Sequence, residues 1–231
     1  MEAFKERAEI LPHLGILSGS KSEDFYDHFP PQLSIKDFST VQSYIEYNNY
    51  RNKKMAKDYI NEEILHKIID HPEEIPKFQW IYEQMRVFVI EIAQFARELE
   101  SICTSSTCEL MNAGNFVYQC ESHQQPQSCC AIDYISHTIE SVWQQLNNEE
   151  IFQDRRNITE QNFLALQGMA TRLYRVFSHV YFQHTAKFTD YEGRTYLHLR
   201  FKTFADQYQL VTPENFIEKL NQSILSQSKK K

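Results

Sequence analysis

The chain has 231 residues, a net charge of −7 and a hydrophobic content of 42%. The acidic balance disfavours general nucleic-acid binding, which needs a basic surface, and no apolar run is long enough for membrane insertion as a helix. Only five Gly and seven Pro argue against a turn-rich all-β fold. Because the N-terminus lacks an apolar signal core and the five Cys are odd in number, we expect a soluble cytoplasmic or nuclear protein, cytoplasmic by preference, without a disulfide framework.

The first part of the chain predicts an arm followed by short helices. Residues 1–38 are rich in Gly and Pro, which break long helices, and they predict an extended N-terminal arm. We expect one domain over residues 39–226 and a disordered basic tail over residues 227–231. Short helices are predicted over residues 40–50 and 61–70, the second ended by a following proline.

Residues 78–102 carry the clearest helical pattern of the chain. Apolar residues recur there at three- and four-residue steps, as on the buried face of a helix. Cys103 continues this stripe, so its thiol starts from a core-facing position, and Cys108 follows after a polar loop. The stripe consists of Ile81, Met85, Phe88, Val89, Ile92, Phe95, Ala96 and Leu99.

The middle of the chain predicts a small β-hairpin and then a helix. Residues 112–115 are a turn signal, and residues 116–120 predict a short strand. Residues 128–131 are a candidate partner strand. A helix is predicted over residues 132–147, and residues 148–157 are polar and predict a loop.

The last part of the chain predicts three more helices. Thr159 is a suitable N-cap for a long helix that runs to His179 and somewhat beyond. A helix is predicted over residues 190–208, and a threonine, a proline and an acid from Thr212 onward signal the start of a final helix.

Two cysteines and two histidines form a candidate metal site: Cys103, Cys108, His179 and His184. Two thiolates and two imidazoles suit tetrahedral zinc, and four protein ligands make such a site structural rather than catalytic. Residues five apart on a straight helix point about 140° apart, so the two histidines can share an ion only if the helix ends or bends between them. The alternative is two buried cysteines and two hydrogen-bonded histidines in a helical core.

Many residues along the chain resemble a known family. Over residues 21–216 the chain is similar to the Mob family, most closely to its phocein branch. It departs from that pattern at Thr171, where a basic residue is common, and over residues 51–76, whose role is left open. The residues that carry the resemblance include Trp80, Tyr82, Glu83, Arg86, Glu91, Cys103, Cys108, Cys120, His123, Tyr134, His137, Arg172, Tyr174, Arg175, His179, His184, Glu192 and Arg200.

The resemblance implies a mainly α fold, a helical bundle with a small β-hairpin, and one structural Zn²⁺ on the four residues above. It also implies a non-catalytic adaptor that binds signalling proteins. For the phocein branch these are a striatin-like scaffold, protein phosphatase type 2A and a germinal-centre kinase. The alternatives are a coactivator of an NDR/LATS-type kinase and a fixed component of a larger assembly.

A zinc hydrolase is the weaker alternative, because it needs a vacant coordination position and a nearby acid or base. Glu192 or Asp190 could be recruited near His184, but so could any surface acid. We therefore expect no enzymatic activity. Cys120, Cys129 and Cys130 are expected to be ordinary thiols without a metal role.

Two further sites are predicted for partners. Arg172 and Arg175 lie three apart on one predicted helix, where two guanidinium groups could bind a phosphate together. Both match a phosphopeptide-binding cluster of the Mob coactivators, while Thr171 predicts a weakened site. The alternative is that each arginine pairs with Glu192 or Asp190.

Residues 58–100 hold ten acids and four bases, a net charge of −6. They predict either a solvated helix face or an acidic surface for a basic partner. The acids assigned to that surface are Glu62, Glu63, Glu83 and Glu91.

Overall fold

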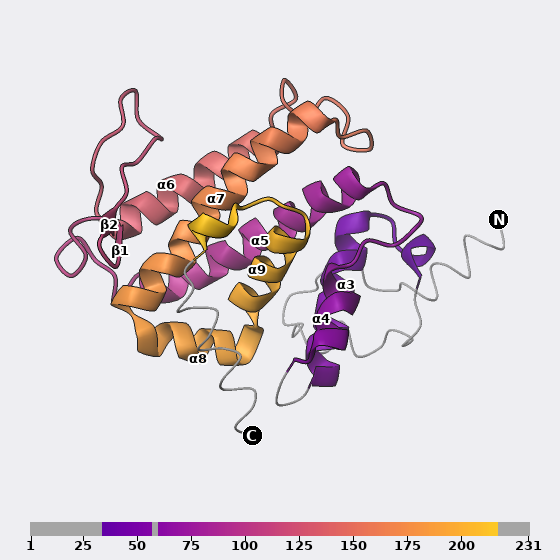
Figure 1. Cartoon of the computed structure of the whole chain (residues 1–231), viewed down its shortest axis with the longest axis horizontal. Helices are drawn as coiled ribbons and strands as arrows, with labels where there is room; N and C mark the ends of the chain where they lie inside the picture. Colours follow the sequence, from indigo (N-terminus) through magenta and orange to yellow (C-terminus); the bar gives the residue numbers. More distant parts are fainter. Residues whose placement is uncertain (1–33, 57–59, 217–231) are drawn as a thin grey trace, which may run out of the picture. The chain divides into compact units, whose positions relative to one another are not determined.

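The structure is a computed structural model that describes residues 34–56 and 60–216 (Figure 1). In these residues it contains seven α-helices and one two-stranded antiparallel hairpin, so the predicted mainly α fold with a small hairpin is confirmed. The chain divides into two compact units between Glu74 and Ile75. The predicted arm up to residue 33, the tail after residue 226 and most of the predicted final helix lie outside the described residues. The single domain over residues 39–226 stays a prediction.

The first unit contains helices α3 (Val41–Ala56) and α4 (Glu62–Ile69), which pack against each other. Helix α3 continues beyond its predicted end at residue 50, because the added segment contains residues such as Lys and Ala that favour helices. Helix α4 begins where the side chain of Asn61 accepts a 2.8 Å hydrogen bond from the backbone N–H of Ile64. Both predicted short helices are therefore present.

The second unit is built around helix α5 (Lys77–Leu99). Helices α6 (Ala131–Leu146) and α7 (Glu160–Gln183) pack on α5 and on each other, and in Figure 1 the three run side by side. All eight residues of the stripe predicted between residues 81 and 99 are buried. This long apolar helix is the centre of the core, and its C-terminal end delivers Cys103 to the candidate metal site.

Helix α7 begins and ends close to the predicted positions. The Thr159 hydroxyl accepts a hydrogen bond from the backbone N–H of Asn162, and the Asn162 side chain accepts one from the backbone N–H of Thr159. The helix ends at Gln183, and His184 has non-helical dihedral angles. The helix thus ends between the two candidate histidine ligands, which is the condition for them to share an ion.

The prediction of one helix over residues 190–208 is wrong. The structure has two helices there, α8 (Thr185–Thr195) and α9 (Leu197–Gln207). Tyr196 between them has a φ angle of 51°, in the left-handed region that a right-handed helix cannot contain. The turn lets α9 pack back on α5 and α7, and Phe201 and Phe204 of α9 are buried.

The small hairpin pairs β1 (Asn112–Ala113) with β2 (Phe116–Val117). Gly114 in the turn has a φ angle of 59°, a conformation that glycine adopts without strain. The predicted partner strand over residues 128–131 does not form. Instead, an isolated bridge joins Cys120 to Gln127, and α6 begins at residue 131. Strand β1 packs on α7 next to the candidate site.

None of the helices in the described part of the chain combines the length and the apolar character needed to cross a lipid bilayer.

Candidate metal centre

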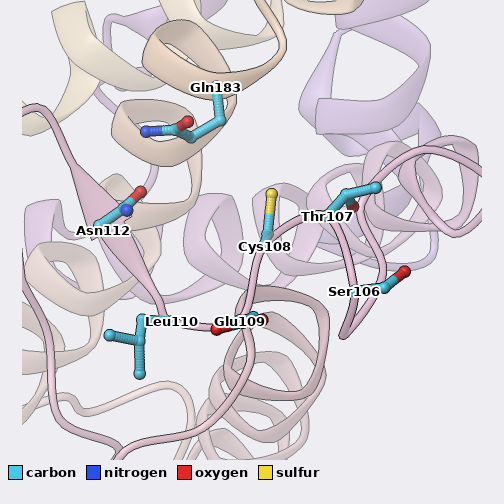
Figure 2. A pocket seen from close by; sticks show the side chains of 7 residues that line it. All are labelled: Ser106, Thr107, Cys108, Glu109, Leu110, Asn112 and Gln183. Atoms are coloured by element: carbon cyan, nitrogen blue, oxygen red, sulfur yellow. The ribbon is translucent and has the colours of Figure 1, made fainter.

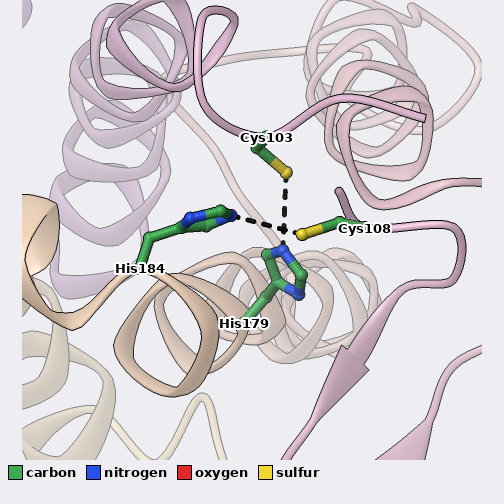
Figure 3. A group of neighbouring side chains, drawn as sticks. All are labelled: Cys103, Cys108, His179 and His184. Carbon is green, nitrogen blue, oxygen red and sulfur yellow. Dashed lines mark hydrogen bonds between the residues drawn. The ribbon is translucent and has the colours of Figure 1, made fainter. Parts of the chain in front are cut away.

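Four side chains from three segments meet at one end of α7 (Figure 3). Cys103 follows the end of α5, and Cys108 lies in the loop after it. His179 is in the last part of α7, and His184 lies between α7 and α8. Their ligand atoms all lie within 4.8 Å of one another. The structure therefore brings together the four residues that the sequence predicts as ligands.

The distances within this group fit a tetrahedral zinc site. The Cys103 Sγ atom lies 3.5 Å from Nε2 of His179, and the Cys108 Sγ atom lies 3.3 Å from Nε2 of His184. Zinc bonds of about 2.3 Å to sulfur and about 2.0–2.1 Å to nitrogen place neighbouring S and N ligands about 3.6 Å apart in a tetrahedron. Small shifts of the side chains would thus complete the coordination of one ion.

His179 is held in the orientation that a ligand needs. Its Nδ1 lies 2.7 Å from the backbone carbonyl oxygen of Asn112 in β1. A carbonyl oxygen can only accept, so Nδ1 carries the proton and Nε2 is left with its lone pair facing the two thiols. Metal-bound histidines commonly make this kind of second hydrogen bond. The hairpin therefore fixes both the ring and its tautomer.

The end of α7 removes the geometric objection to the spacing of the two histidines. His184 has φ −134° and ψ 47°, so its side chain is not constrained to the helical direction that would point away from His179. The backbone N–H of His184 still bonds to the carbonyl of Val180. The chain therefore turns at His184, which allows the His184 imidazole to point toward that of His179.

The electrostatic environment of the group is that of a buried site. Burial raises the pKa of the Cys103 thiol to about 12, and the neighbouring Cys108 adds to the shift. Burial lowers the pKa values of His179 and His184, which favours neutral imidazole, the form that binds metals. A divalent cation would supply the charge that allows two thiolates to share this buried space.

A shallow cavity of about 300 Å³ lies on the Cys108 side of the group (Figure 2). Cys108 is one of the residues that line it, and the other lining side chains belong to the loop after α5, to β1 and to the end of α7. Apart from Cys108, Glu109 is the only titratable residue of that lining. The lining residues are Ser106, Thr107, Cys108, Glu109, Leu110, Asn112 and Gln183.

The two acids considered for a hydrolase have other partners. Glu192 is buried, and its carboxylate accepts hydrogen bonds from the backbone N–H groups of His198 and Leu199 at the start of α9. Asp190 forms an ion pair with Arg194 at 3.0 Å. Neither carboxylate belongs to the Cys/His group. Glu192 thus stabilises the turn between α8 and α9, and Asp190 forms a surface ion pair within α8.

Arg172 and Arg175 share the face of α7 that lies against α6, and neither pairs with the acids expected in the alternative interpretation. The Arg175 Nη1 group donates a 2.8 Å hydrogen bond to the Tyr134 hydroxyl, and its guanidinium lies 4.9 Å from the ring centre of Tyr118. Arg172 is half-buried with one long contact, 3.4 Å, to Ser141 Oγ, and burial lowers its pKa. Among the described residues, no carboxylate forms an ion pair with either arginine.

The four acids predicted as a partner surface differ in exposure. Glu62 and Glu63 are exposed at the start of α4, where Glu63 pairs with Lys67 at 2.6 Å. Glu83 is half-buried, and its Oε2 atom lies 3.7 Å from Nε of Arg86. Burial raises the pKa of the Glu83 carboxyl group. Glu91 is half-buried and pairs with the fully buried Arg200. Glu83 and Glu91 are therefore held within the helical unit, which leaves Glu62 and Glu63 as the exposed members.

A second Cys/His group lies near the start of α6 and was missed by the sequence prediction. Its members are Cys120, His123, Cys129 and His137, whose ligand atoms also lie within 4.8 Å of one another. Cys120 and Cys129, which were expected to be ordinary thiols without a metal role, each lie beside a histidine in this group, and that expectation stays a prediction. The signal in the sequence was the two-residue gap between Cys120 and His123, a spacing typical of metal-binding turns.

Comparison with known proteins identifies the family of this chain. The sequence profile of the Mob1/phocein family matches residues 57–219. The chain belongs to the Mob1/phocein family. It is 35% identical over 205 residues to MOB kinase activator-like 4 from Drosophila melanogaster, covering 88% of each chain. It is 32% identical over 200 residues to MOB-like protein phocein from Caenorhabditis elegans, covering 86% of each chain.

A more distant plant relative extends this similarity. The chain is 27% identical over 165 residues to MOB kinase activator-like 2A from Arabidopsis thaliana, which covers 67% of this chain and 76% of the relative. The resemblance inferred from the sequence, including its phocein character, is therefore confirmed.

Proposed function

We propose that this family member is a non-catalytic adaptor whose helical unit is stabilised by one structural zinc ion on Cys103, Cys108, His179 and His184. The observation that carries the proposal is the similarity over most of the chain to proteins named as phocein and as kinase activator-like. The four-residue group supports the zinc, because its donors and their separations suit one tetrahedral ion. Bound there, zinc would tie the end of α5 to the end of α7.

The same donor set supports a non-catalytic role. Four protein ligands complete the tetrahedral coordination of zinc, so no position remains for a substrate or an activated water. The cavity beside Cys108 contributes only one carboxylate, Glu109, and no histidine outside the metal ligands. A general acid–base pair next to the ion, which hydrolysis would need, is therefore missing from the residues that line this cavity.

Within the family, we assign the chain to the phocein role, as a subunit that binds a striatin-like scaffold together with protein phosphatase type 2A and a germinal-centre kinase. The alternative is coactivation of an NDR/LATS-type kinase. The name of the Drosophila relative, MOB kinase activator-like 4, supports this alternative. A fixed place in a larger assembly remains the third candidate. The departure at Thr171 removes a cation from the predicted phosphopeptide cluster and leaves the choice among these roles open.

Two surfaces support binding to proteins. The arginine pair on α7 offers two guanidinium groups that form no ion pair with a carboxylate of the described residues, and Tyr118 and Tyr134 hold Arg175 in place. A phosphate group could accept hydrogen bonds from both arginines. The exposed acids Glu62 and Glu63 of α4 would attract a basic partner segment, and this attraction would weaken as salt is raised.

Affinity purification from cells that naturally express the chain tests the assignment. We expect a striatin-like scaffold and phosphatase type 2A subunits among the partners that mass spectrometry quantifies. Recovery of an NDR-type kinase without the scaffold would support the coactivator alternative instead. A Glu62→Lys/Glu63→Lys variant, compared with the parent at low and raised salt, tests whether α4 contributes: a partner retained equally by both proteins at both salt concentrations contradicts that surface.

A further inference from the structure

Exposed hydrophobic side chains gather around the small hairpin. In the described part of the chain seven large hydrophobic side chains are exposed, and five of them come from the loop after α5, the hairpin or the end of α7. Single exposed hydrophobic residues are ordinary in proteins, but a group of them often marks a surface that another segment covers. The five are Ile102, Leu110, Phe116, Val117 and Phe182.

Four of these side chains lie next to one another on and around the hairpin. The Phe182 ring lies against the hairpin turn, because a Cβ atom built on Gly114 would be 3.6 Å from its Cζ atom. Leu110 lines the cavity beside Cys108 together with Gln183, the neighbour of Phe182 in the chain. We call this surface the hairpin face, and its members are Leu110, Phe116, Val117 and Phe182.

The cavity at the border of the hairpin face contains a polar group without a partner. Figure 2 shows the side-chain amides of Asn112 and Gln183 facing the same opening. The Oδ1 atom of Asn112 is buried and accepts no hydrogen bond from any described residue. Because buried polar atoms are normally hydrogen-bonded, this cavity suits a segment that brings its own N–H donors, as a peptide backbone does.

The chain at this border is acidic. Residues 100–120 contain two acids, Glu100 and Glu109, and no lysine or arginine. Both acids are exposed, and neither forms an ion pair with a described residue. Two uncompensated carboxylates beside an apolar surface favour an occupant that is both apolar and basic.

Residues 217–231, which follow the described part of the chain, have this composition. They contain four lysines and one acid, a net charge of +3. Their apolar residues Ile217, Leu220 and Ile224 have the i, i+3, i+7 spacing of a helix that binds a surface through one face. The basic run Lys229–Lys231 comes after them.

The described chain ends close enough for this segment to reach the hairpin face. Phe216 packs edge-on against Tyr174 of α7, with ring centres 5.0 Å apart. Tyr174 precedes Gln183 by nine residues, which is about 14 Å along a helix. Fifteen residues span about 22 Å as a helix and up to about 50 Å when extended. The segment is therefore long enough to pass along and around α7.

We propose that residues 217–231 bind the hairpin face of the same chain. Their apolar residues contact the four hydrophobic side chains of the face, and Lys229–Lys231 lie beside Glu100 and Glu109. An outside partner then reaches the hairpin face only by displacing this segment, so the contact is autoinhibitory. Because its ionic part is exposed to solvent, salt weakens the contact.

Carbodiimide coupling of the full chain tests the proposal, because it joins a carboxylate only to an amine that is in direct contact with it. Mass spectrometry of the monomeric product should find Glu100 or Glu109 joined to lysines of the run Lys229–Lys231. The variant Leu220→Ser/Ile224→Ser should reduce the yield at least about fivefold, because it removes two apolar contacts. The matched control Asn221→Ser/Gln222→Ser exchanges polar residues of the same segment and should stay within about twofold of the parent.

Three results of this coupling overturn the proposal. The first is that the parent yields no product between these lysines and either acid. The second is that the two double variants give equal yields. The third is that the product occurs only in covalent dimers, which would show that the segment occupies the hairpin face of a second copy.

Hydrogen exchange tests the contact from the side of the hairpin. We expect the amides of residues 109–118 to exchange faster in Leu220→Ser/Ile224→Ser than in the parent and the control. The variant Phe116→Ser/Val117→Ser changes two side chains that are more than half exposed, so the fold should persist. It should lose the coupled product as Leu220→Ser/Ile224→Ser does. Unchanged exchange in the hairpin, or an unchanged coupling yield in this variant, contradicts the contact.

Discussion

Arg200 illustrates how single residues of this protein combine charge with the core. Its side chain is 0% exposed, its guanidinium lies 5.7 Å from the ring centre of Phe88, and its charge is balanced by Glu91 on α5. Removing one partner of a buried ion pair leaves the other charge without compensation, which costs about 3–5 kcal/mol. We therefore expect Glu91→Ala to lower the free energy of unfolding by about that amount, measured by urea denaturation of the zinc-loaded protein.

Glu98 on the same helix is the matched control for this substitution. It pairs with Lys187 at 2.6 Å and Arg194 at 3.1 Å, but all three side chains are partly exposed. Exposed pairs contribute about 0–1 kcal/mol, so Glu98→Ala should have a small effect. Equal losses from the two substitutions would show that Glu91 is an ordinary surface acid, as the predicted acidic surface would require.

His198 gives the protein a defined response to acid. Its ring is fully buried among Tyr174, Phe177 and Phe188, and burial lowers its pKa to about 3. The unfolded chain takes up a proton on this histidine below about pH 6.5 while the folded chain does not. His198 should therefore reduce the stability as the pH falls from about 6.5 toward about 3, and have little effect above pH 7.

The variant His198→Phe isolates this contribution. A phenyl ring fits the aromatic surroundings and cannot be protonated, so the variant should lose less stability on acidification than the parent. At pH 5.5 the difference, relative to pH 7.5, should be about 1.4 kcal/mol. Protonation of the zinc ligands affects both proteins alike and cancels in the comparison. Parallel stability curves for the two proteins between these pH values would show that the folded His198 is protonated.

At the scale of elements, the proposed zinc ion of the first group would join the end of α5 to the end of α7. Zinc binding to small structural sites is worth on the order of 10 kcal/mol, and half of that corresponds to about 10–20 °C of melting temperature for a chain of 150–250 residues. We expect Cys108→Ser to lower the melting temperature by at least about 10 °C. The control Cys130→Ser should change it by a few degrees at most.

Hydrogen exchange would show which parts of the chain lose stability when the zinc ion is removed. In zinc-loaded protein treated with chelator, amide protection should fall first in residues 100–111 and at the junction of α7 with α8. The amides of α4, which lie in the other unit, should keep their protection. Uniform loss over both units would indicate that the ion does not act locally, and no loss at all would indicate that the four residues are an ordinary helical core.

The elements that could be predicted from the sequence are those with a strong local signal. The stripe from Ile81 to Leu99 and the N-cap at Thr159 defined α5 and the start of α7. The turn at Tyr196 could not be predicted, because tyrosine has no preference for the left-handed conformation. That conformation is imposed by the packing of α9 on α5 and α7, which is a tertiary effect.

The candidate sites differ in the same way. The first metal group was predictable because its residues match a family pattern, and the break at His184 that its geometry requires is present. The second group was missed because Cys120 and Cys129 were considered singly, whereas the fold of the loop brings them to His123 and His137. Glu91 does not belong to an exposed acidic surface, because it pairs with Arg200, a residue more than one hundred positions away in the chain. A local sequence pattern around Glu91 could not have predicted this pairing.

At the scale of the whole molecule, the adaptor role predicts binding of phosphorylated peptides through α7. A phosphothreonine peptide should bind more tightly than its unphosphorylated form, because Arg172 and Arg175 offer charged donors to the phosphate. The absence of a cation at Thr171 predicts weak binding. We expect the Arg172→Ala/Arg175→Ala variant to lose at least tenfold in affinity by calorimetric titration.

The variant Arg155→Ala/Arg156→Ala is the control for this titration. It removes the same charge from the polar loop before α7, where both arginines are exposed. Its affinity for the phosphopeptide should stay within about twofold of the parent if the contact is local rather than a general effect of charge. Equal losses in the two double variants, or equal binding of both peptides by the parent, would contradict an anion site on α7.

The claim that this molecule is a zinc-stabilised adaptor and not a zinc enzyme depends on closed coordination of the ion by Cys103, Cys108, His179 and His184. Cobalt substitution measures this directly, because the visible spectrum of Co²⁺ reports the number and type of its ligands. The account predicts a tetrahedral spectrum whose thiolate charge-transfer bands lose intensity in Cys103→Ser and are unchanged by added azide. A spectrum that shifts on adding azide, which would mean an open coordination position, would contradict it.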